Sequence, residues 1–175
     1  MDHTANTLRA ISKALTDVIA PALDPKDPLA SEQLRLVIDY VNFMRQRLDH
    51  LGERRRFELH QQVQIASALV GMMGAATAAT QKVLQASLSE GRVTWALPGA
   101  TIAQLTKATA ALAGAIRRLV REAARFSVDA RRPIERCVVD ASATQIMFER
   151  AWYLPLGFEP AAGEVTSLAE LLAKT

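Results

Sequence analysis

Apolar residues recur every three or four positions along most of the chain, which is the spacing of one face of an α-helix. This pattern predicts a first helix over about residues 5–23. Its apolar face is formed by Leu8, Ile11, Leu15, Val18 and Ala22. Two prolines then break the chain, and Asp27 stands where it can cap a second helix that begins at Pro28.

The second helix is expected to run to about Leu51, where Gly52 supplies a stop. Its apolar positions step alternately by three and four residues, as in a heptad repeat. They are Leu34, Val37, Val41, Met44, Leu48 and Leu51. This seam is typical of a helix that packs lengthwise against another helix.

A third helix is predicted over about residues 55–90, ending at Gly91, with a loop over residues 92–100. Within it, residues 61–81 carry no charge and are long enough to span a bilayer. The stretch holds four glutamines, and its apolar residues are mainly Ala, Gly and Met, which contribute little to membrane insertion. We therefore predict a helix that is buried on most sides, and no membrane span.

A fourth helix is predicted from the capping-box pair Thr101 and Gln104 to about Asp129. A fifth begins at Pro133 and leads into an irregular aromatic segment, residues 152–164, which is expected to fold back as a lid over one end of the bundle. A short tail helix over residues 167–173 follows. Together these elements predict an all-α fold: one domain, residues 1–175, forming an up-down bundle of four to five main helices with a short C-terminal helix.

Glycines interrupt the third and fourth predicted helices. If these helices pair antiparallel, Gly71 and Gly74 face Gly114 among many alanines. A glycine inside a helix costs about 1 kcal/mol relative to alanine, so an offsetting gain is expected. Close packing of the two backbones is the favoured interpretation. The alternative is a slot for an apolar ligand beside Met72 and Met73.

The composition fits a cytoplasmic helical protein. Half of the 175 residues are apolar and 31 are alanine, which favours a packed helical core over disorder. The single cysteine, Cys137, rules out a disulfide framework within one chain. The first residues lack the basic and apolar regions of a secretory signal, so we expect a cytoplasmic protein.

The net positive charge of the chain, +3, comes entirely from one segment, residues 117–136. Residues 117–136 hold seven arginines and a local net charge of +4, whereas the rest of the chain sums to −1. In the predicted up-down bundle, the arginines at the end of the second helix and the start of the third lie at the same pole. The candidate anion-binding residues are Arg54, Arg55, Arg117, Arg121, Arg125 and Arg132. A solvated bundle end is the favoured interpretation, because cations commonly complement the carboxyl ends of helices.

No catalytic residue, metal ligand or cofactor is predicted. His3, His50 and His60 are too few and too poorly spaced for a metal site inside a bundle. Cys137 lies beside Arg136 near a helix start, a setting that could lower the pKa of its thiol. No histidine is near it in the sequence, so packing is the favoured role.

These features leave three hypotheses for function. The first is a non-enzymatic helical bundle that acts through protein–protein contacts, as a homodimer, since its apolar seams are long and its third helix is apolar on more than one face. The second is binding of, or catalysis on, a phosphate-bearing small molecule such as a nucleotide or CoA ester at the arginine pole; an acidic protein partner is a related possibility. The third, less favoured for lack of a DNA-binding motif, is nucleic-acid binding there.

Overall fold

The computed structural model describes residues 3–173, and it confirms the all-α prediction. Helices make up 82 % of the structure, and no strand occurs among the described residues. The described chain forms two compact units: residues 3–50 with 150–165, and residues 51–149 with 166–173. We describe each by itself. That they make a single domain stays a prediction.

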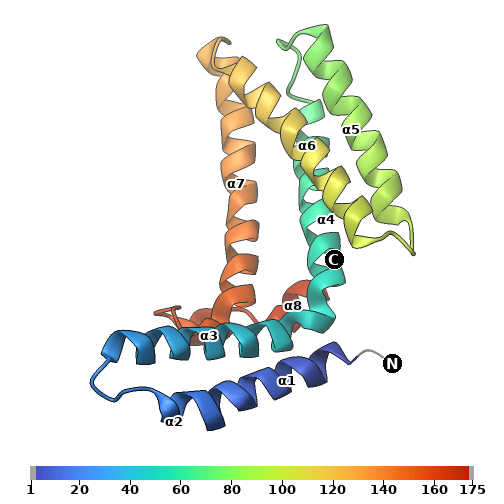
Figure 1. The fold of residues 1–175 in the computed structure, drawn as a ribbon. Coiled ribbons are helices and arrows are strands. Elements are labelled where there is room, and N and C mark those ends of the chain that lie inside the picture. Colours follow the sequence, from blue (N-terminus) through green and yellow to red (C-terminus); the bar gives the residue numbers. More distant parts are fainter. Residues whose placement is uncertain (1–2, 174–175) are drawn as a thin grey trace. The chain divides into compact units, whose positions relative to one another are not determined.

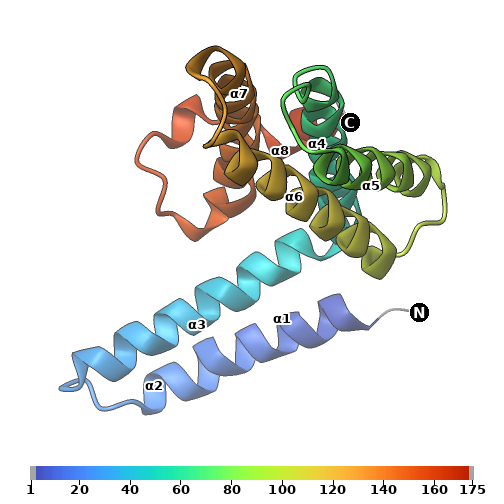
Figure 2. The same cartoon turned by 90° about the horizontal axis from the view of Figure 1, so that it is seen from above.

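The first unit is built on a helical hairpin (Figures 1 and 2). Its first arm comprises α1 (Thr4–Ala14), a π-helical turn (Leu15–Ile19) and α2 (Ala20–Ala22). The second arm is α3 (Pro28–Arg47), which packs along α1. As predicted, Pro28 opens α3, and the Asp27 side chain accepts a hydrogen bond from the Ala30 amide at 2.9 Å.

The aromatic segment completes the first unit by folding back on α3. Phe43 of α3 is buried against the Trp152 ring edge-on and the Tyr153 ring face-on, with centroids 6.4 and 5.6 Å away. Arg47 donates hydrogen bonds to the carbonyls of Trp152 and Ala151, at 2.8 and 3.1 Å. Two 3₁₀ turns, Leu154–Leu156 and Ala162–Glu164, follow.

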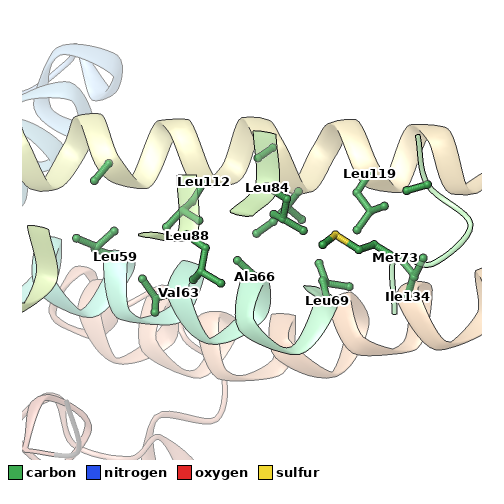
Figure 3. Packing of buried hydrophobic residues seen from close by; sticks show 14 of the residues in the cluster. Leu59, Val63, Ala66, Leu69, Met73, Leu84, Leu88, Leu112, Leu119 and Ile134 are labelled. Atoms are coloured by element: carbon green, nitrogen blue, oxygen red, sulfur yellow. The ribbon is translucent and has the colours of Figure 1, made fainter. Parts of the chain in front are cut away.

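The second unit centres on three helices that contact one another pairwise: α4 (Leu51–Val70), α5 (Ala78–Ala96) and α6 (Ile102–Ala123). A 3₁₀ turn, Leu48–His50, leads into α4. Figure 3 shows apolar side chains from these helices meeting in one core, together with Ile134 of α7 (Val128–Tyr153). The labelled core residues are Leu59, Val63, Ala66, Leu69, Met73, Leu84, Leu88, Leu112, Leu119 and Ile134.

The prediction of one helix over residues 55–90 is wrong. The chain leaves the helix after Val70 and re-enters it at Ala78, where the Thr77 hydroxyl caps α5 by accepting from the Thr80 amide. The Gln81 amide group fastens the intervening turn by donating to the carbonyls of Met73 and Ala76, at 3.1 and 3.0 Å. The glycines of this stretch therefore belong to a reversal of the chain.

The predicted pairing of Gly74 with Gly114 is wrong for the same reason. No atom lies within 4 Å of a Cβ built on either residue, so neither marks a close helix contact. The close approach is at Gly91, the residue expected to end the helix. A Cβ at Gly91 would lie 2.6 Å from Leu112 Cδ1 and 3.4 Å from Val63 Cγ2. Because α5 passes through Gly91 to Ala96, the following loop is shorter than predicted.

Most helix ends follow the sequence signals. Thr101 and Gln104 form the predicted capping box at the start of α6. Ser167 caps α8 (Leu168–Leu172), which packs on α4 and buries Leu171. The start of α7 differs, since the helix begins at Val128 and takes Pro133 into its second turn.

Candidate functional site

The structure does not bring the six predicted arginines to one pole. Because the chain reverses at residues 71–77, α4 and α6 run in the same direction, and the start of α4 lies far from the end of α6. Arg56, at the start of α4, donates to the carbonyl of Trp95 at the end of α5, at 2.9 Å. Glu122, near the end of α6, accepts from Thr77 at the start of α5. The 19 residues of α5 therefore separate the two clusters by about 28 Å.

Arg54 and Arg55 are engaged by carboxylates. Arg54 donates to Glu58 at 2.8 Å and to Glu149 of α7 at 3.2 Å. Arg55 donates to the other oxygen of Glu58 at 2.5 Å. The Arg54 side chain is only 16 % exposed. The Arg54–Glu149 pair joins α4 to α7, whereas the pairs with Glu58 lie within α4.

The other four predicted arginines lie in the second half of α6, in the turn that follows it and at the start of α7. Arg117, Arg121, Arg125 and Arg132 are exposed, and none forms an ion pair within the described chain. They are as expected for a solvated end of a helical unit. Binding of an anionic small molecule, an acidic protein or a nucleic acid by these four stays a prediction.

Glu122 lies among these arginines and holds the turn before α5 in place. It accepts hydrogen bonds from the Thr80 hydroxyl at 2.5 Å and from the Thr77 amide at 2.6 Å. Arg118 donates to the same Thr80 hydroxyl at 2.9 Å. The hydrogen bond from Thr80 is the main cause that holds the pKa of Glu122 below its ordinary value, and the bond from the Thr77 amide is the second. Both bonds favour the ionised form of the carboxyl.

Replacement Glu122→Gln should therefore make the protein less stable at neutral pH. The ionised carboxylate stabilises the fold above its ordinary pKa of 4.5, and this contribution is lost as the pH falls through the lowered folded-state pKa. The Tm difference between wild type and variant should be largest near neutrality. It should shrink toward zero as the pH falls below about 4.5. Thermal unfolding across this range measures it. Glu90→Gln, an exposed site on α5, should show no such trend, and an equal trend there would contradict the assignment.

The structure gives Cys137 a packing role. Its thiol is half-buried against the core, and burial, reinforced by the nearby Asp140 charge, raises its pKa. This shift is opposite in direction to the lowering that a position beside Arg136 near a helix start suggested. Within residues 3–173, no group of three or more His, Cys, Asp or Glu side chains could hold a metal ion. Over the same residues, none of the helices is both long and apolar enough to cross a bilayer.

An uncovered apolar surface of the first unit lies on its hairpin. No residue of α1, the π turn or α2 is buried, although their apolar positions share a face. On α3, a second set of apolar residues, at steps of eight, three and four positions, lies beside the row that packs on α1. It comprises Leu29, Val37, Tyr40 and Met44, each at least 44 % exposed. Ile11 and Ile19 of the first arm are similarly exposed.

Helical phase places these residues on one side of the hairpin. Ser12 and Asn42 meet in a hydrogen bond of 3.1 Å and so mark one edge of the α1–α3 contact. In antiparallel helices with 100° between successive residues, Ile11 and Val37 then fall on the opposite edge. The π turn, which is wider than an α turn, keeps Ile19 in line with Ile11. We call this surface the hairpin face: Ile11, Ile19, Leu29, Val37, Tyr40 and Met44.

Sequence patterning found part of the hairpin face, as a seam expected to pack lengthwise against another helix. Val37 and Met44 belong to the predicted heptad seam, whereas Leu29 and Tyr40 lie outside that seam. The second stripe could have been recognised from the four-residue steps Leu29, Gln33 and Val37 followed by Tyr40 and Met44.

Comparison with protein-family models, curated proteins and solved structures yields no match to this chain.

Proposed function

We propose that this protein acts through protein–protein contacts and that the hairpin face joins two copies of the chain. The observation that carries the proposal is an amphipathic first arm that buries none of its residues. Helices in proteins owe most of their stability to packing of an apolar face. An arm of this kind gains that packing when a second surface covers it.

A second hairpin fits this surface better than a single helix. In a four-helix bundle, each helix contacts two neighbours and needs an apolar strip toward each. On α3, one strip faces α1, and the Val37–Met44 strip is uncovered. The ion pairs Arg35–Glu32 and Arg35–Asp39 lie along α3 outside the stripe, as expected for the solvated rim of an interface. Two copies related by a twofold axis would cover both uncovered strips.

The double variant Val37→Glu with Met44→Glu should abolish the dimer. Both side chains are close to half-exposed in the chain, so the fold of one copy tolerates the change, but the dimer would have to bury two unpaired carboxylates from each copy. The dimer dissociation constant should rise by roughly 100-fold or more. Sedimentation equilibrium over a range of protein concentrations measures it, and circular dichroism checks that helicity is kept.

Val139→Glu is the matched control, because Val139 is an exposed apolar residue of α7 in the second unit. This variant should dimerise as the wild type does. Loss of the dimer with Val139→Glu but not with the double variant would move the interface to α7. A wild-type protein that is monomeric at every concentration tested would refute the proposal.

A further inference from the structure

A groove runs along the second unit between α4 and α5. Three hollows lie in a row in it, with volumes of about 390, 470 and 380 Å³. The first and second share Trp95 and Ala96, and the second and third share Arg92. The shared residues make the hollows one continuous feature. Even by itself, the middle hollow has a volume in the usual range for a small-molecule site.

The middle hollow combines aromatic, apolar and cationic groups. The His60 ring lies against the Trp95 ring, with centroids 4.9 Å apart, and Val63 lines the hollow beside them. Arg92 and Gln64 also line the hollow; the Gln64 amide nitrogen lies 3.3 Å from His60 Nε2, which leaves its second N–H to donate. His60 Nδ1 is buried without a hydrogen-bond partner among the described residues. An apolar pocket with a few converging polar groups is the usual composition of a ligand site.

Arg92 is the cation that this groove leaves available. In the neighbouring hollow, the Arg56 guanidinium donates hydrogen bonds to three carbonyls, those of Trp95, Leu97 and Pro98. Arg92 is exposed and donates one hydrogen bond, to the Ser67 hydroxyl at 2.9 Å. Its remaining N–H groups can form the paired hydrogen bonds that a guanidinium makes with a carboxylate.

We propose that this groove binds a small carboxylate that carries an aromatic body. The carboxylate pairs with Arg92, with Gln64 as a further donor, and the aromatic body lies on Trp95 and Val63. Arg92 selects the negative charge, since it faces no carboxylate in the middle hollow. Trp95 selects a flat apolar group, because aromatic rings stack favourably on an indole. The groove residues belong to the second unit and the hairpin-face residues to the first, so the proposal does not depend on dimerisation.

The test uses the full chain labelled with ¹⁵N and three matched probes: 4-phenylbutyrate, its neutral analogue 4-phenylbutanol, and butyrate. Trp95 and Trp152 give two indole N–H signals, which Trp95→Phe assigns. Phenylbutyrate should shift the Trp95 signal saturably and leave that of Trp152 in place. The alcohol and butyrate should each bind about tenfold or more weaker, since each lacks one of the two recognised groups.

Arg92→Gln should reduce phenylbutyrate affinity to that of phenylbutanol, again by about tenfold or more. Lys107→Gln is the control, since it removes one positive charge from α6 and none from the groove. Two results would each overturn the proposal. One is the absence of a Trp95 shift up to about 10 mM phenylbutyrate; the other is equal binding of the acid and the alcohol to the wild type.

Discussion

Phe148→Ala should lower the free energy of unfolding by about 3–5 kcal/mol, the largest effect expected of any substitution considered for this chain. The Phe148 side chain is fully buried, and its ring stacks on Phe57 of α4 with centroids 4.0 Å apart and an interplanar angle of 15°. Truncation removes that stack and leaves a cavity between α4 and α7. The Arg54–Glu149 ion pair beside it would lose the packing that positions it.

Urea denaturation followed by circular dichroism measures this loss, at fixed protein concentration so that association does not contribute. Met147→Ala is the control on the same helix, because Met147 is 45 % exposed and adjacent in sequence. Its cost should stay below about 1 kcal/mol. Similar losses for the two variants would show that α7 is not anchored through the Phe57–Phe148 stack.

Gly91→Val should destabilise the protein by about 3 kcal/mol. Even a single methyl group at this position would lie 2.6 Å from Leu112 Cδ1, and valine adds two more carbons. Leu112 is itself fully buried, so its side chain can shift only by displacing its neighbours in a close-packed core. The variant must push α5 away from α6 or force strained rotamers, and both loosen the shared core.

Gly114→Val separates this crowding from the general effect of replacing a helical glycine. Gly114 lies within α6, and no atom would come within 4 Å of its new Cβ. Since valine has a somewhat higher helix propensity than glycine, stability there should change by no more than about 0.5 kcal/mol. The same chemical denaturation measures both variants. A loss at position 114 as large as at 91 would rule out the Leu112 contact as the cause.

Local signals in the sequence predicted most helices because they act within a few residues. As predicted, α3 begins at the proline after Asp27. The Thr101–Gln104 pair caps the start of α6, and Ser167 caps the start of α8. Apolar spacing of three and four residues identified the core side of α6. These signals depend on backbone hydrogen bonds and the helical repeat, which a single sequence displays directly.

The turn at residues 71–77 was missed because its signals resemble those of a buried helix. Alanine, methionine and glycine around Gly74 fit both tight helix packing and a chain reversal. The distinguishing feature is Thr77, whose hydroxyl caps the next helix, preceded by two glycines. This one reversal changes the direction of every later helix. It therefore also explains why the arginines of α4 and α6 were expected together and are found apart.

The groove residues were missed for a related reason. Placing the helix end at Gly91 put Arg92 and Trp95 in a loop, where their spacing from His60 carries no information. In the structure α5 continues to Ala96, so Arg92 and Trp95 share one helical face. Whether glycine ends a helix or admits a neighbouring side chain depends on Leu112, which is 21 positions further along.

The order in which the chain visits its two compact units limits how it can be divided. The chain passes from one unit to the other after residues 50, 149 and 165, and the second of these passages lies inside α7. Cutting after residue 50 would separate Phe43 from Trp152, its partner in the same unit. Each unit is therefore assembled from two separate stretches of the sequence, so no single cut divides the described chain into segments that each hold one whole unit.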